Sequence, residues 1–200
     1  VQELTRKGKR YLKNNLLDYN IIGKSRHSII LSNEYNCLLI KKDYKINEHA
    51  TFSLSDRPEK LGRKAKTDNF PRICSLAHIE KNKIKYFVIN THLDNSDKEN
   101  KKRLLDIFEN IISKYKKEDE LIVIVGDFNM SIKNKNLVNF SEKYKDPFKD
   151  NKISSCIWVP QLPSIDHIFL DKNLNYNNEL IDTSMNISDH YPLICEIERK

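Results

Sequence analysis

The sequence predicts a single mixed α/β domain built on two packed β-sheets, and three observations lead to this prediction. Short runs rich in β-branched and aromatic residues occur along the whole chain, as expected for strands. A helical segment separates two of the most apolar runs, which leaves room for a crossover between parallel strands. A length of 200 residues suits one domain with a substantial core, and no repeat or linker divides it.

Nine segments are predicted as strands from their β-branched and aromatic content. In chain order they are YNIIG (19–23), YNCLLIK (35–41), TFSL (51–54), ICSLAHIE (73–80), IKYFVINTH (84–92), LIVIVGD (121–127), SIDHIFLD (164–171), ELIDT (179–183) and YPLICEIE (191–198). The fourth and fifth read as a hairpin that turns at Lys81, Asn82 and Lys83. Apart from the crossover pair, we expect the strands to be antiparallel.

Three segments are predicted as helices from an apolar face that recurs about every 3.6 residues. The first lies near the start of the chain, where Leu4, Tyr11 and Leu12 share a face. The second lies between Ser96 and Lys116, with the apolar face Leu104, Leu105, Phe108, Ile111 and Ile112. A shorter pattern covers residues 136–144. Because the second helix joins FVINTH to LIVIVGD, these two strands are predicted to be parallel.

Composition excludes a disordered chain, since 38% of the residues are hydrophobic and only four are Gly. The net charge of +7 suits a polyanionic partner, although scattered lysines are more often plain solvated surface. Residues 56–70 form the one long polar insertion, either a surface loop or a basic loop beside a substrate groove. No run is long enough for a membrane-spanning helix.

The four cysteines are far apart and never form a Cys-x-x-Cys pair. Small buried hydrophobic side chains are favoured over a zinc site, and disulfides stay open as an alternative. The chain opens directly on VQEL, without Met or a leader, as a fragment or a processed product would. The cytoplasm is mildly favoured, but secretion remains open, so no compartment is predicted.

Polar side chains crowd the ends of several apolar runs, where a buried carboxylate would be costly unless it is paired or binds a cation. The stretch IVIVGDFNM is the clearest case, because a fully apolar strand ends on Asp127 and Asn129. Side chains two apart on a strand share a face, so this pair either forms a turn or points into a site. The further members of this set are Asn90, His92, Asp94, Asp166, Asp189 and His190.

These residue types suit metal-assisted hydrolysis of a phosphoester. Mg²⁺ prefers carboxylate and carbonyl oxygens and neutralises phosphate charge. A His that is oriented by a carboxylate can deprotonate the attacking water. A second His or an Asn can donate a hydrogen bond to the phosphate as its charge rearranges.

Five motifs in order resemble the signature blocks of the endonuclease/exonuclease/phosphatase superfamily, and they extend from the first residues to the last strand. They are VQEL, INTHLD, VGDFNM, SIDHIF and ISDHYPL. The resemblance implies a DNase I-like fold, which is a four-layer α/β sandwich with two mixed sheets flanked by helices. It implies Mg²⁺ or Mn²⁺ as the cofactor. It also implies one domain over residues 1–200 that lacks the family's first N-terminal strand, whose Asn helps to hold the metal.

The resemblance implies the hydrolytic machinery at four positions. His190 matches the general base and Asp166 the residue that orients it. Asp127 and Asn129 match the pair that positions the attacking water and contacts the phosphate.

The resemblance also implies the residues for the metal and for the leaving side of the phosphate. Glu3 and Asp189 match metal-binding carboxylates. His92 matches a His that contacts the phosphate or protonates the leaving oxygen, and Glu34 matches its carboxylate partner.

The substrate is expected to be a nucleic acid or another phosphoester. Arg72 lies where many members place a phosphate-binding Arg, and Asn90 is expected to contact the phosphate as well. The chain has LPSIDHIF where inositol 5-phosphatases carry Trp-Cys-Asp-Arg, and it has no apolar hairpin typical of a sphingomyelinase. The basic residues 57–66 favour a polyanionic substrate, so a phosphodiesterase or nuclease is expected. The chain is also expected to be a monomer. The alternatives are a phosphatase or phosphodiesterase for a small-molecule or lipid phosphate, and a catalytically silent polyanion-binding domain.

Overall fold

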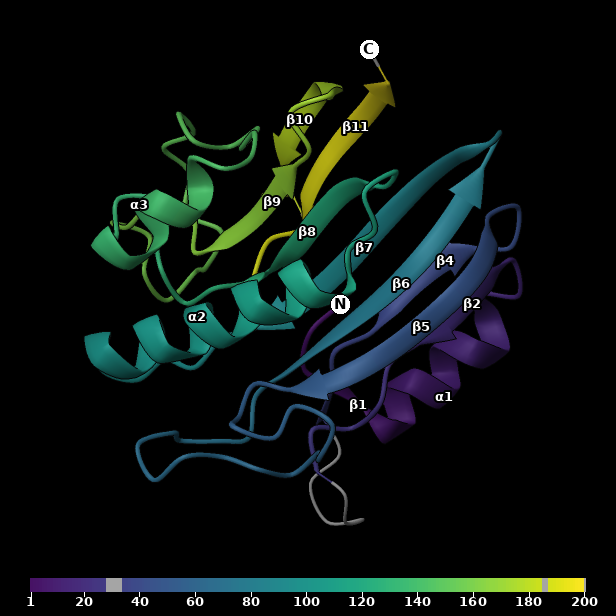
Figure 1. Cartoon of the computed structure of the whole chain (residues 1–200). Coiled ribbons are helices and arrows are strands. Elements are labelled where there is room, and N and C mark those ends of the chain that lie inside the picture. The colour runs from purple at the N-terminus through teal and green to yellow at the C-terminus, as the bar shows by residue number, and fades with distance from the viewer. Residues whose placement is uncertain (28–33, 185–186, 200) are drawn as a thin grey trace.

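The chain folds into stacked layers of helices and sheets in the computed structural model, which describes residues 1–27, 34–184 and 187–199 (Figure 1). Its elements are β1 (Leu4–Thr5), α1 (Arg6–Asn15), β2 (Tyr19–Ile22), β3 (Glu34–Tyr35), β4 (Leu38–Lys41), β5 (Lys45–Ser53), β6 (Ile73–Lys81), β7 (Ile84–His92), α2 (Lys98–Tyr115), β8 (Leu121–Asp127), α3 (Lys135–Ser141), β9 (Asp166–Leu170), β10 (Leu174–Ile181) and β11 (Leu193–Arg199). Helices α2 and α3 cover one face of the largest sheet, and α1 lies beyond its other face. The predicted α/β class with mixed sheets flanked by helices is confirmed.

The largest sheet has five strands in the order β5-β6-β7-β8-β9. Strands β7 and β8 are parallel and are joined through α2, so the predicted crossover is confirmed. The other neighbours in this sheet pair antiparallel, including the predicted β6–β7 hairpin. Parallel pairing brings the carboxyl ends of β7 and β8 to the same edge, and the antiparallel β9 begins there.

Apolar side chains are buried on both faces of the five-stranded sheet. On the helical side, the predicted face of α2 packs against the sheet, with Phe108 and Phe128 fully buried edge to face. On the opposite side, Ile22 of β2 and Leu38 of β4 pack on Ala77 of β6. Strand β8 alternates buried residues with half-buried ones, so both of its faces are at least partly covered and it reads as a continuous apolar run.

The smaller sheets are β1–β3, β2–β4 and β10–β11, each with two strands among the described residues. Strand β5 is longer than the predicted 51–54, because its polar first half is held by pairing with β6 rather than by an apolar pattern. Strand β10 likewise begins before the predicted 179–183. The first predicted helix is present as α1, but it begins at Arg6, so Leu4 of its predicted apolar face lies in β1. Leu12 is half-buried, whereas Tyr11 is 67% exposed.

Gly126 allows β7 and β8 to approach closely just before they end. Its φ is +154°, and a Cβ atom at this position would lie 2.2 Å from the carbonyl oxygen of Thr91. A larger residue would therefore push the two strands apart.

The cysteines behave as small apolar residues in this fold. All four are free thiols, and Cys37, Cys74 and Cys156 are buried. No described helix has the length and apolar character needed to cross a membrane.

Candidate active site

Three adjacent strands place their polar ends at one level of the sheet. His92 of β7 is the register partner of Asp127 on β8, and Asp127 is the register partner of Asp166 on β9. The backbone continues this alignment, since Leu93 N–H donates to Asp127 O at 2.9 Å. The polar residues that follow these apolar strands therefore meet at one edge of the sheet.

His190 joins this cluster from the loop before β11. Its Nδ1 lies 2.7 Å from Asp166 Oδ2, which also accepts a hydrogen bond of 2.6 Å from Ser155 Oγ. Ser155 is fully buried, and its Oγ accepts from the backbone N–H of Asp166. With Nδ1–H donated to the carboxylate, the Nε2 of a neutral His190 is left as a proton acceptor.

Asn129 turns back onto Asp127 through a left-handed backbone, with φ at 51°. Its N–H donates to Asp127 Oδ1 at 2.7 Å, and its Nδ2 donates to Leu93 O at 2.9 Å. Lys101 of α2 donates to Asn129 O at 3.0 Å. This turn fixes both oxygens of the Asp127 carboxylate beside His92.

His92 is buried between carboxylates and cations. Its Nε2 lies 3.4 Å from Asp127 Oδ2, and its Nδ1 lies 3.8 Å from Glu3 Oε1. Burial, followed by the charges of Arg72 and Arg26, lowers the pKa of His92 to about 2. At neutral pH this side chain is therefore an uncharged imidazole, able to donate one hydrogen bond but not to act as a charged acid.

A pocket of about 130 Å³ opens over these groups. Glu3 takes part with a left-handed φ of 52°, a conformation that non-glycine residues seldom adopt outside functional or tightly held positions. Asp189 enters from the other side and accepts from Trp158 Nε1 at 3.3 Å. The residues that line the pocket are Gln2, Glu3, His92, Asp127, Asp166, Ser188, Asp189 and His190.

The pocket lining is rich in carboxylates, and the described residues that form it include no Lys or Arg. Burial and the neighbouring carboxylate of Asp166 raise the pKa of Asp127 to about 7. The hydrogen bond to Asp166, with the charges of Asp127 and Asp189, raises the pKa of His190 to about 9. Ligand atoms of Asp127, Asp166 and His190 all lie within 4.8 Å of one another. A hard divalent cation would relieve this crowding of carboxylates, so the donor set fits such an ion.

Glu34, Arg72 and Asn90, which were predicted as site residues, bind protein groups outside the pocket lining or beneath it. Glu34 pairs with Arg26 at 2.8 Å instead of with His92, whose neighbouring carboxylates are Glu3 and Asp127. The buried Arg72 pairs with Asp94 at 2.9 Å.

Asn90 is fully buried beneath the pocket. It accepts from Gln2 Nε2 at 2.6 Å, and its own amide donates to the carbonyl oxygens of Val1 and Cys37. Asn90 therefore holds the segment that carries Glu3, and Arg72 braces the loop after His92.

Sequence reasoning missed five residues of the site, namely Gln2, Lys101, Ser155, Trp158 and Ser188. The side chains of Lys101, Ser155 and Trp158 each contact a predicted residue, but they come from segments that carry no motif. Ser155 lies in the run SSC, which gives no pattern at all. For Gln2, adjacency to Glu3 in VQEL was the only available signal.

No family model matches the sequence, and no curated protein matches it significantly. Solved structures do match its fold. An endonuclease/exonuclease/phosphatase from Bacteroides vulgatus superposes with a TM-score of 0.83 at 21% identity, covering 100% of this chain and 83% of its own. The mannosyl-6-phosphatase Bt3783 of Bacteroides thetaiotaomicron has a TM-score of 0.81 at 20% identity, covering 98% and 83%. D. rerio TDP2, complexed with a single-strand DNA product, has a TM-score of 0.73 at 17% identity, covering 98% and 84%.

The chain therefore has the endonuclease/exonuclease/phosphatase fold, and the resemblance of its five motifs is confirmed at the level of the fold.

Proposed function

We propose that this chain is a metal-dependent phosphoester hydrolase that acts as a phosphodiesterase or nuclease. The observation that carries the proposal is the 2.7 Å pair of His190 and Asp166, which opens onto a pocket shared with Asp127 and His92. The fold of the phosphoesterases described above supports the reaction class, and the basic chain supports a polyanionic substrate.

In this proposal His190 is the general base. Its neutral Nε2 takes a proton from water, the water oxygen bonds to phosphorus, and the opposite P–O ester bond breaks. The leaving oxygen takes a proton from solvent at the open pocket. Asp166 orients His190 and stabilises the imidazolium, while Ser155 fixes that carboxylate in place.

Other side chains bind the phosphate and the attacking water. Asp127 orients the water, and it is itself held by Asn129. A neutral His92 donates a hydrogen bond to a phosphate oxygen, which stabilises charge without proton transfer. The buried cations Arg26 and Arg72 contribute a favourable field from behind His92.

Glu3 and Asp189 are proposed to hold Mg²⁺ or Mn²⁺, because both line the pocket and neither is committed to orienting the base. When bound, the ion would neutralise phosphate charge. A nearby cation would also lower the pKa of His190 from about 9, which favours the neutral form required of a base.

The test is hydrolysis of single-stranded RNA, single-stranded DNA, bis(p-nitrophenyl) phosphate and a hexose 6-phosphate, each with Mg²⁺, Mn²⁺ or EDTA. We expect metal-dependent cleavage of the diesters, lost at least a hundredfold in His190→Ala. His49→Ala, which removes a ring outside the pocket, is the control on bis(p-nitrophenyl) phosphate.

Cleavage of the hexose phosphate alone would replace the nuclease by a small-molecule phosphatase, a reading supported by the similarity to mannosyl-6-phosphatase Bt3783. Wild-type turnover in His190→Ala would refute the proposed base. A folded protein that cleaves none of the four substrates, under any of the metal conditions, would favour a silent binding domain.

A further inference from the structure

Helix α1 carries an unusual concentration of charge. Its ten residues, RKGKRYLKNN, contain five Lys or Arg and no acidic residue. The net charge of the whole chain is +7, so this one helix supplies five of those seven charges. Half of the residues of this helix are Lys or Arg, compared with 35 of the 200 residues in the whole chain.

Four of these cations have no described partner. Lys9 donates to Gly23 O and lies over the ring of Tyr35, whereas Arg6, Lys7, Arg10 and Lys13 make no ion pair within the described part of the chain. Some cations elsewhere on the surface form such pairs, whereas the unpaired cations of α1 are concentrated on one helix. Examples are Lys81 with Asp43, Lys85 with Asp119, Lys102 with Asp106, Lys117 with Glu48 and Lys143 with Glu109.

The charges on α1 work against the helix that carries them. Arg6 and Lys7 occupy the first turn, where the helix dipole favours acidic residues. Arg10 lies three or four residues from Arg6, Lys7 and Lys13, and like charges at these spacings are destabilising. Local helix stability therefore does not explain these residues, whereas attraction to an external anion does.

The helix links two concave regions of the surface. Gln2 and Glu3, just before it, line the candidate active site, while Lys13, Asn14, Leu16 and Leu17, at its end, line an open hollow of about 880 Å³. Ten residues of α-helix span about 15 Å. In a double helix each strand places a phosphate about every 3.4 Å along the axis, so a strand with that stacked geometry would place about four phosphates along this length.

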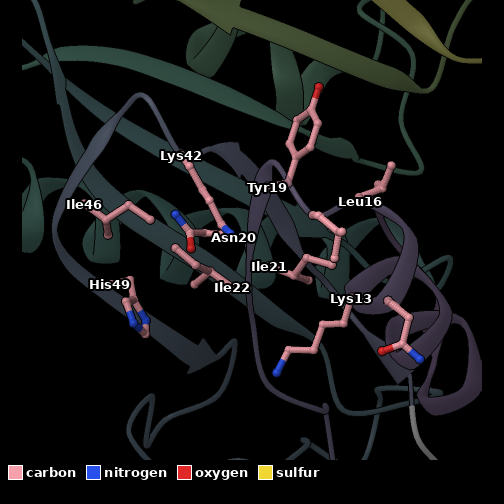
Figure 2. A pocket seen from close by; sticks show the side chains of 11 residues that line it. Lys13, Leu16, Tyr19, Asn20, Ile21, Ile22, Lys42, Ile46 and His49 are labelled. Atoms are coloured by element: carbon pink, nitrogen blue, oxygen red, sulfur yellow. The ribbon is translucent and has the colours of Figure 1, made fainter.

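The hollow offers both cationic and apolar groups. Figure 2 shows Lys13 and His49 on opposite sides of it, with Ile21 and Ile22 between them and Lys42 above. Two aromatic rings are available on these segments, since Tyr11 of α1 is 67% exposed and Tyr19 lines the hollow. Cations that follow a backbone, together with rings on which bases stack, are typical of surfaces that bind single strands.

We propose that α1 and the adjoining hollow form a binding surface for single-stranded nucleic acid, leading the strand toward the pocket at Glu3. The phosphates follow Arg6, Lys7, Arg10 and Lys13, and the bases rest on Tyr11 and on the apolar floor of the hollow. This inference rests on the proposed phosphodiester hydrolysis for its direction, but binding to the surface is measured without catalysis.

The test is fluorescence anisotropy of a labelled 12-nucleotide DNA strand with the inactive His190→Ala chain, titrated at several salt concentrations. The triple variant Lys7→Gln/Arg10→Gln/Lys13→Gln is compared with Lys83→Gln/Lys149→Gln/Lys172→Gln, which loses the same charge at exposed positions elsewhere. Gln is a good helix former and removes the like-charge repulsion, so α1 should stay folded.

The α1 variant should lower the slope of log K against log salt by about two and weaken binding at 0.1 M salt about a hundredfold, as expected for three lost phosphate contacts. The control triple should change the slope much less. Tyr11→Ala should weaken binding of the single strand more than binding of a duplex of the same sequence.

Equal losses in the two triple variants would overturn the proposal, because binding would then follow net charge alone. Binding to phosphatidylserine vesicles, without measurable binding of the strand, would also overturn it in favour of a membrane surface. Hydrolysis of bis(p-nitrophenyl) phosphate by the wild-type chain separates the two proposals. A strand that is bound through α1, with neither the strand nor bis(p-nitrophenyl) phosphate cleaved by the metal-loaded protein, would refute the proposed phosphodiesterase and leave the binding surface supported.

Discussion

Replacing Asp127 by Asn should stabilise the metal-free protein at neutral and alkaline pH while it abolishes hydrolysis. Burial and Asp166 raise the pKa of Asp127 to about 7 from an ordinary value of 3.8. The folded chain therefore holds this proton more tightly than the unfolded chain, and stability is lost as the pH rises from about 4 to 7. Asn is of the same size and carries no charge, so this loss disappears.

The magnitude follows from the pKa shift and the hydrogen bonds. A shift of about three pH units corresponds to about 4 kcal/mol, from which changes in local hydrogen bonding must be subtracted. Asn keeps an oxygen to accept from Asn129 N–H, and its amide can donate to the neutral ring of His92. The net gain at pH 8 should be about 2 to 4 kcal/mol, which is roughly 5 to 15 °C in Tm for a domain of this size.

The assay is thermal and urea unfolding in EDTA at pH 4 and pH 8. Asp150→Asn is the control, because it removes a carboxylate at an exposed position outside the pocket. A gain for Asp127→Asn that is as large at pH 4 as at pH 8, or a loss at pH 8, would refute the reasoning.

Three other outcomes are expected. In the metal-free protein, NMR titration should show the pKa of His190 falling from about 9 toward 6.5 in Asp166→Asn. The raised pKa of His190 stabilises the fold below pH 6.5, and this stabilisation is lost as the pH rises through 9. The free energy of unfolding of the wild type should therefore fall by about 1 to 2 kcal/mol between these pH values, whereas that of Asp166→Asn should not. Gly126→Ala should cost about 3 kcal/mol or more in urea unfolding, because its Cβ would meet the carbonyl of Thr91. Phe128→Ala should cost about 3 to 5 kcal/mol in the same assay, and a cost below 1 kcal/mol would contradict its place in the core.

The elements that the sequence predicted well are those whose burial is uniform along their length. Helix α2 and strands β7 and β8 have apolar residues wherever the fold needs them, so their period and order predict the parallel crossover. The first half of β5 is polar and the three two-stranded sheets are short, so their pairing depends on neighbours far away in the chain.

The same distinction separates the candidate site residues. His92 and Asp127 end the predicted parallel pair of strands, so their proximity follows from the predicted crossover, whereas Asp166 begins the antiparallel β9 beside them. The ion pair of Glu34 with Arg26 could not be predicted, because it depends on a short strand with no apolar pattern. Ser155 and Trp158 reach the site from a loop, where the sequence carries no periodicity from which to predict a position.

The register of the three strand ends has a consequence for biosynthesis. Glu3 precedes the five strands of the largest sheet in the sequence, whereas His190 lies beyond all of them, in the loop before β11. Strands β5 to β9 can pair before His190 has been synthesised, so a partly made chain can hold the sheet and the groups proposed to bind phosphate without the proposed base. The proposed hydrolysis would therefore begin only after His190 has been synthesised and its loop has packed against Asp166.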